Sequence, residues 1–156
     1  MKKLILSVVI ALFALLPTKE SKAQDYTWGI GFRGTYYPAL SIKQQLSSRN
    51  SMDYIVSFRN HGFQATAIYE WKTPVINNNF HLYYGIGGSI GLWDDYRDNK
   101  YKDELGFRAG VDGILGLEFK IPNVPITLSV DYKPYINLIG WGNDFANGAF
   151  SVRYVF

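Results

Sequence analysis

The chain has 156 residues, enough for one domain but small for two, and it contains no cysteine. The lack of cysteine excludes a disulfide scaffold, a thiolate metal site and a lipid anchor on an N-terminal cysteine. Four lysines and one glutamate in residues 1–23 account for the formal charge of +3, so the remainder is neutral and no nucleic-acid partner is expected.

Residues 1–23 have the three-part organisation of a secretory signal peptide. Two lysines precede an apolar run from Leu4 to Leu16, which ends at Pro17. The small residues of Ser21-Lys22-Ala23 then provide a cleavage site. Because the apolar run is too short to span a bilayer comfortably, we predict a cleaved signal at 1–23 instead of a membrane or core helix.

Beyond residue 24, apolar side chains recur at every second position, which predicts β-strands and no amphipathic helix. In the first strand, the residues Tyr26, Trp28, Ile30, Phe32 and Tyr36 share one face, and later segments repeat this alternation. We predict eight strands, at residues 25–37, 40–47, 52–59, 62–72, 79–92, 104–120, 125–134 and 148–156.

The connections between these strands indicate an up-and-down order. Most are short and contain Pro or Asn, as turns do, and only residues 93–104 and 134–148 form long connections. With an even number of strands, both long connections lie at the end opposite the termini. Outer-membrane barrels have this asymmetry, because their outer loops are longer than their inner turns.

The polar faces of the strands indicate which face lies inside. They carry mainly Gly, Ser and Thr with isolated charges, whereas a water-exposed surface would be rich in Lys and Glu. Small residues suit the filled lumen of a narrow barrel, so we expect the apolar faces outside; a soluble lipocalin-like barrel would reverse them. Charges in a narrow lumen need partners. Those expected there are Arg33, Arg108, Lys133 and Arg153 with Glu70, Asp112, Glu118 and Asp131.

Aromatic residues near the strand ends fit two girdles at the edges of a lipid bilayer. They are Tyr26, Trp28, Tyr36, Tyr37, Trp71, Phe80, Trp93, Tyr132 and Phe156.

The alternating strands and the ending FSVRYVF resemble the small eight-stranded outer-membrane β-barrel proteins of the OmpX and OmpA-transmembrane-domain kind. The resemblance covers about residues 25–156 and implies an all-β, antiparallel, up-and-down transmembrane barrel over residues 24–156, in the outer membrane of a Gram-negative cell. In that family a C-terminal aromatic in strand register is read by the barrel-assembly machinery. The matching residues are Phe150, Val152, Tyr154 and Phe156.

Some barrels of this size modify lipid A, and the deacylase among them has a His-x-Ser motif. Neither histidine here has that serine, since the sequence reads His61-Gly62-Phe63 and His81-Leu82-Tyr83. The segment GIGGSIG, Gly85 to Gly91, opens no helix and is not a dinucleotide loop. Its small residues are expected to make room for lumen neighbours such as Tyr83 or Arg108. We therefore predict no catalytic residue and no cofactor.

One connection is acidic. It contains Asp94, Asp95, Asp98, Asp103 and Glu104. These residues raise the possibility of a divalent-cation site, but interleaved Arg and Lys and the lack of EF-hand spacing favour a solvated outer loop without metal.

Together these patterns predict a monomeric, non-enzymatic outer-membrane barrel protein with a structural or surface-interaction role. Its lumen is expected to be plugged by Arg33, Arg108 and Arg153 paired with Glu70, Asp112 and Glu118. The expected partners are membrane lipid, lipopolysaccharide and, during biogenesis, the assembly machinery. A lipid A-modifying enzyme and a very narrow, gated pore are the alternatives.

Overall fold

The computed structural model describes residues 26–59, 62–76, 78–93, 106–139, 145 and 147–156. The predicted signal peptide at 1–23, His61 and the acidic connection from Asp94 to Glu104 lie outside these residues. Within the described ranges, no helix is long and apolar enough to cross a lipid bilayer.

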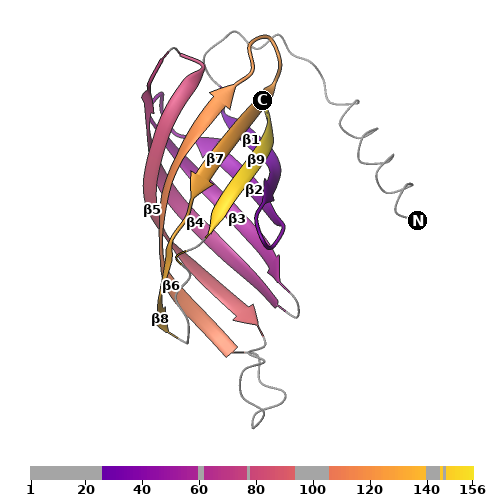
Figure 1. Cartoon of the computed structure of the whole chain (residues 1–156), viewed down its shortest axis with the longest axis vertical. Helices are drawn as coiled ribbons and strands as arrows, with labels where there is room; N and C mark the ends of the chain where they lie inside the picture. The colour runs from indigo at the N-terminus through magenta and orange to yellow at the C-terminus, as the bar shows by residue number, and fades with distance from the viewer. Residues whose placement is uncertain (1–25, 60–61, 77, 94–105, 140–144, 146) are drawn as a thin grey trace, which may run out of the picture.

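The described part of the chain forms nine β-strands (Figure 1). They are β1 (Trp28–Gly34), β2 (Ala39–Gln45), β3 (Asn50–Arg59), β4 (Gly62–Pro74), β5 (Phe80–Trp93), β6 (Gly106–Lys120), β7 (Ile126–Tyr132), β8 (Tyr135–Ile139) and β9 (Gly148–Val155).

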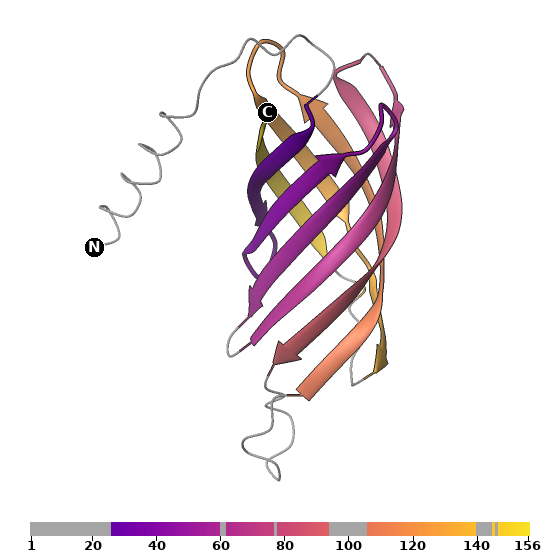
Figure 2. The same cartoon turned by 180° about the vertical axis from the view of Figure 1, so that it is seen from behind.

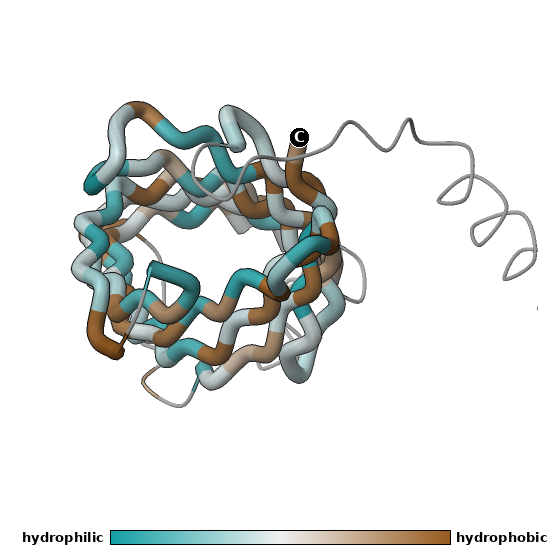
Figure 3. The backbone as a smooth tube through the Cα atoms, turned by 90° about the horizontal axis from the view of Figure 1, so that it is seen from above, coloured by the Kyte–Doolittle hydropathy of each residue, from teal (hydrophilic) through white to brown (hydrophobic). Residues whose placement is uncertain are grey.

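The strands close into one antiparallel barrel. Every strand pairs with its neighbour in the chain from β1 to β7, and β9 closes the ring by pairing with both β1 and β7. Strands β7 and β8 both pair with β6 and are separated only by Lys133 and Pro134, so they act as two halves of one barrel strand. The predicted eight-stranded, up-and-down antiparallel barrel is therefore confirmed, and Figure 3 shows the closed ring from above.

The described chain starts and finishes at the same end of the barrel, which we call the terminal end. There the backbone N–H groups of Thr27 and Trp28 donate to the carbonyl oxygen of Phe156, at 3.1 and 3.0 Å. Strands β1, β3, β5 and β8 finish at the opposite end, which we call the loop end. The described strands that flank both predicted long connections therefore meet them at the loop end.

One of those connections was predicted as loop but contains strand β8. Proline has no N–H to donate, so Pro134 interrupts the ladder, and the pairing of β7 with β9 ends at Tyr132 and Gly148. The chain beyond it still pairs with β6, where Val111 faces Ile136 and the register shifts between Ala109 and Gly110. The prediction of a loop at residues 135–139 was wrong because a proline was taken as the end of the strand.

The wall of the barrel has two heights. Strands β5 and β6 have 14 and 15 residues, whereas β1 and β2 have seven each. We call β4, β5, β6 and β8 the tall wall, and β9, β1 and β2 the short wall. Figures 1 and 2 show the tall wall extending beyond the short wall at the loop end.

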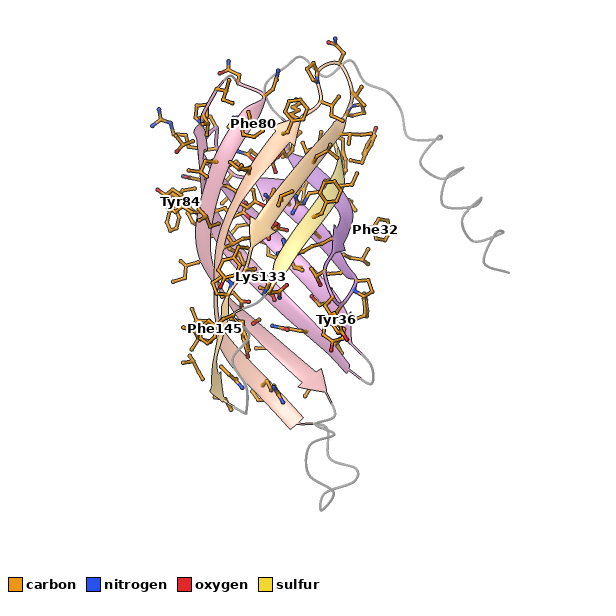
Figure 4. The ribbon with its side chains drawn as sticks, viewed as in Figure 1. Phe32, Tyr36, Phe80, Tyr84, Lys133 and Phe145 are labelled. Atoms are coloured by element: carbon orange, nitrogen blue, oxygen red, sulfur yellow. The ribbon has the colours of Figure 1, made fainter. Side chains whose placement is uncertain are left out.

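The apolar and polar faces are arranged as the alternation predicts, with apolar side chains outside. Phe32 is 55% exposed, whereas the adjacent Arg33 is 1% exposed. Figure 4 shows Phe32, Phe80 and Tyr84 directed away from the barrel. Further exposed apolar residues surround it on every strand, including Ile30, Ile42, Val56, Phe63, Ile86, Ile90, Leu115, Val130, Ile136 and Val152.

Tyr26 is an exception among the predicted girdle aromatics. It was assigned to the outer face with Trp28, but it is buried at the terminal end of the lumen. The chain bends at Thr27, just before β1 begins, so the alternation of the strand does not extend back to Tyr26.

Candidate functional site: the charged lumen

The lumen contains a balanced set of buried charges. Among the described residues, five cations and five anions are at most 5% exposed. They are Arg33, Lys43, Lys72, Lys133 and Arg153, and Asp53, Glu70, Asp112, Glu118 and Asp131. Because burying an unpaired ion is costly, the equal numbers make complete pairing possible.

Glu118, on β6, is the centre of the contacts nearest the terminal end. Its Oε1 lies 2.9 Å from Lys72 Nζ and accepts a hydrogen bond from the Tyr26 hydroxyl, also at 2.9 Å. Its Oε2 lies 3.3 Å from Lys43 Nζ. Lys43 also lies 2.8 Å from the Oε2 of Glu70, so Lys43 is shared between two carboxylates and Glu118 between two lysines.

Arg153, on β9, binds three strands at once. Its Nη2 lies 2.9 Å from Asp53 Oδ2 on β3, and its Nε donates to Ser41 Oγ on β2 at 2.9 Å. Its Nη1 donates to Ser129 Oγ on β7 at 2.7 Å. Ser41 in turn donates to Asp53 Oδ1 at 2.7 Å, which fixes the carboxylate for the guanidinium.

Arg33, on β1, forms a bidentate ion pair with Asp131 on β7. The Tyr83 hydroxyl donates to the same carboxylate at 2.9 Å, and the Nζ of Lys43 lies 4.4 Å from the centre of the Tyr83 ring. Tyr83 thereby connects this pair to Lys43. Together with the neighbouring group around Arg153 and Asp53, these residues form what we call the inner network: Arg33, Lys43, Lys72, Arg153, Asp53, Glu70, Glu118 and Asp131, with Tyr26 and Tyr83.

A second, smaller group lies toward the loop end and is called the outer network. Lys133 forms an ion pair with Asp112, which also accepts a hydrogen bond from Ser89. Gln64 Nε2 donates to Ser89 Oγ at 2.8 Å. Figure 4 labels Lys133 in the lower half of the barrel, toward the loop end.

Seven predicted lumen charges are buried in the lumen, but their pairing differs from the prediction. Arg33 was expected to pair with Glu70, Asp112 or Glu118, and it binds Asp131 instead. Arg153 binds Asp53. The carboxylates of Glu70, Glu118 and Asp112, which were expected to pair with arginines, bind lysines. Arg108 is only half-buried and lies on the lumen face of β6 close to the loop end.

The sequence reasoning missed Lys43, Asp53 and Lys72. Each alternates with an outward apolar residue, as Lys43 does with Ile42, so the period-two pattern contained the signal. Lys43 and Lys72 supply the counter-charges of Glu70 and Glu118. Without them the predicted list had the wrong partners for both carboxylates.

Two glycines of GIGGSIG, Gly85 and Gly87, make room for the backbone of β4 and for apolar neighbours, whereas Gly91 lies opposite Arg108 in the ladder with β6. A Cβ at Gly87 would lie 2.8 Å from Ile68 Cγ1, and one at Gly85 would lie 3.1 Å from Ile114 Cγ2. Space for the Tyr83 ring comes from Gly116 on β6, where a Cβ would lie 2.6 Å from Tyr83 Cζ. The prediction was wrong for Tyr83, whose space comes from Gly116, whereas Gly91 of the segment does lie opposite Arg108.

The remaining chemical candidates are few. His81 is half-buried near the terminal end of β5, opposite Glu118 in the ladder with β6. In the part of the chain that the structure describes, no group of three or more His, Cys, Asp or Glu side chains is placed to hold a metal ion.

The last strand presents two different faces. Phe150, Val152 and Phe156 are exposed on the outside, and the Tyr154 ring lies 6.1 Å from the Phe156 ring. Ser151 and Arg153 are buried in the lumen. The register pairs Tyr154 with Ile30 of β1 and Ile126 of β7.

Comparison with protein-family models and with curated proteins finds no match to this chain.

Proposed function

We propose that the protein is an integral outer-membrane β-barrel protein with a structural or surface-interaction role and no enzymatic activity. The observation that supports this most strongly is the inversion of its two faces: the charges are inside and the apolar side chains are outside.

This inversion suits lipid and not water. Soluble proteins rarely expose apolar patches beyond a few hundred Å², whereas here exposed apolar residues occur on every strand around the barrel. A closed barrel satisfies all its strand hydrogen bonds internally, as a hydrocarbon environment requires. Alternation of apolar-out and polar-in along each strand is the pattern of transmembrane barrels.

The membrane, the family and the route of export are parts of the same proposal. The signal-peptide pattern of residues 1–23 supports export, and the outward Phe150, Val152, Tyr154 and Phe156 support recognition by the barrel-assembly machinery. The fold supports membership of the OmpX and OmpA-like class. The partners proposed are membrane lipid and lipopolysaccharide around a monomer.

The role is proposed to be non-enzymatic because the conserved chemistry of known lipid A deacylases, His-x-Ser, has no counterpart at His61 or His81. The paired lumen charges are occupied in holding the strands together. What remains for contact with the exterior are the connections at the loop end.

Gel mobility tests the proposal. The protein extracted in detergent and run without boiling is expected to migrate differently from the boiled sample, since a closed barrel resists the denaturant. It is also expected to fractionate with outer membranes. A protein that stays soluble and monomeric without detergent would contradict the proposal, and altered lipid A in the mass spectrum of overexpressing cells would contradict the non-enzymatic role.

A further inference from the structure

The two charge networks are separated by a layer of apolar side chains within the lumen. Ala39, Ile55, Ile68, Tyr83 and Ile114 form one contacting cluster, and all five are at most 4% exposed. We call Ala39, Ile55, Ile68 and Ile114, together with the Tyr83 ring, the apolar layer. Branched apolar side chains clustered in a lumen are unexpected, because most of the described interior is polar, charged or glycine-rich.

The position of the layer follows from the strands. On β3, Ile55 is the next lumen residue after Asp53 toward the loop end; on β4, Ile68 has the same relation to Glu70. On β6, Ile114 lies between Asp112 on the loop side and Glu118 on the terminal side. The layer therefore lies between the inner and the outer network.

The remaining side of the lumen at this level is also closed. The bidentate pair of Arg33 and Asp131 crosses from β1 to β7, and the Tyr83 hydroxyl binds this pair from the apolar side. Ala149 of β9 is buried on the loop side of Ser151. None of the contacts described above joins the inner network to the outer one.

The region on the terminal side of the layer has buried polar atoms with hydrogen-bonding capacity for water. Glu70 Oε1, Thr127 Oγ1 and Ser151 Oγ are buried and have no hydrogen-bond partner in the described part of the chain. Buried polar groups of this kind are the positions that internal water occupies. Glu70 and Thr127 lie on the terminal side of the apolar layer, so the inner region can be hydrated while the layer excludes water.

We propose that the apolar layer is the barrier to ion flow through this barrel, and that opening it produces a narrow channel for small ions. Apolar constrictions block ions because they dewet, even where polar groups lie on both sides. The inner and outer networks then provide the polar segments of an ion path on the two sides of the apolar layer. This inference rests on the proposed function, since only a membrane-spanning barrel separates two aqueous compartments.

The glycines beside the layer make it easy to open. Gly87 faces Ile68 and Gly85 faces Ile114, so neither neighbour has a side chain that fills a gap left by truncation. The double variant Ile68→Ser with Ile114→Ser removes both branched side chains and adds hydroxyls. The control is Ile86→Ser, which lies on the same strand as the glycines but is 56% exposed on the outer face.

The experiment is conductance of the full-length barrel in planar bilayers, after each sample has shown the heat-dependent gel shift of a folded barrel. The wild type and Ile86→Ser are expected to stay closed, and the double variant is expected to show discrete, narrow open events. The single variant Ile114→Ala, which adds no polar group, is expected to show rarer openings and replaces the double variant if that does not fold.

Two results would overturn the inference alone: folded serine or alanine variants that stay as closed as the wild type, or open events in Glu118→Gln with the layer intact. The second result would make the charge network the barrier. A wild type that gives no heat-dependent shift and does not insert would instead overturn the proposed function, and the inference with it.

Discussion

The inner and outer networks hold the barrel together to very different extents. The inner network has four cations and four anions, from seven strands, and Tyr83 adds the eighth position of the ring. The outer network consists of one ion pair, Lys133 with Asp112, and the hydrogen bonds of Ser89 and Gln64, and its members lie on β4, β5, β6 and the link between β7 and β8. The comparison indicates that the inner network closes the ring, including the seam between β9 and β1, while the outer network supports the extension of one wall.

The largest effect is expected from Glu118→Gln. The substitution keeps the shape but leaves Lys72 without its carboxylate and Lys43 with only Glu70. Removing one partner of a buried ion pair costs roughly 3–5 kcal/mol of unfolding free energy. Urea titration of the barrel in lipid vesicles, followed by tryptophan fluorescence, measures the loss.

Asp112→Asn is the matched change in the outer network and sharpens the comparison. It removes one carboxylate from a single buried pair, whereas Glu118 serves two lysines, so its cost is expected at the low end of the same range, about 3 kcal/mol. Equal losses for the two variants would contradict the proposed difference between the networks.

The seam between β9 and β1 depends on Arg153, and a double-mutant cycle isolates its main contact. Arg153→Met and Asp53→Leu are each expected to destabilise the barrel, because each leaves a buried charge whose partner lay 2.9 Å away. The double variant removes both charges, so we expect a coupling energy of about 2–3 kcal/mol, the upper range for contacting pairs. Additive losses would show that Ser41 and Ser129, and not Asp53, supply most of the stabilisation of Arg153.

The residues of these networks show what the sequence could and could not predict. Period-two alternation is a local property, so it correctly placed Arg33, Glu118 and Arg153 in the lumen. Which charges meet depends on how far the strands are staggered around the ring, and Arg33 binds Asp131, which is 98 residues away. No local pattern contains that stagger, so the pairing was wrong. Tyr26 was missed for a similar reason, because the bend at Thr27 is not encoded in the alternation.

The apolar layer between the networks offers a smaller test with a built-in control. A Cβ at Gly87 would lie 2.1 Å from the Ala67 carbonyl oxygen and 2.8 Å from Ile68 Cγ1, so Gly87→Ala must displace the neighbouring strand β4. Overpacking of this kind costs about 1–3 kcal/mol. Gly88→Ala, one residue along and on the outer face, meets nothing closer than the Gly110 carbonyl oxygen at 3.6 Å. It is expected to leave the urea midpoint unchanged, and a loss equal to that of Gly87→Ala would mean that strand propensity, not the layer, is responsible.

The smallest effect on stability is expected at the terminal end, where Phe156 contributes nothing to either network. Its backbone binds Trp28 and Thr27, but the residue is 58% exposed. Phe156→Ala keeps the backbone contacts and removes only the ring, so the unfolding free energy is expected to change by about 1 kcal/mol or less. If the outward aromatics of β9 are the assembly signal that we propose, the yield of folded barrel in cells falls nevertheless.

Phe80→Ala is the control, since Phe80 lies near the same end, on the outside of β5, and its ring centre lies 6.2 Å from that of Phe119. A yield for Phe156→Ala that matches the yield for Phe80→Ala would remove the special role of the last residue. A low yield with an unchanged urea midpoint would separate the requirements of assembly, which lie on the outer face, from those of stability, which lie in the inner network.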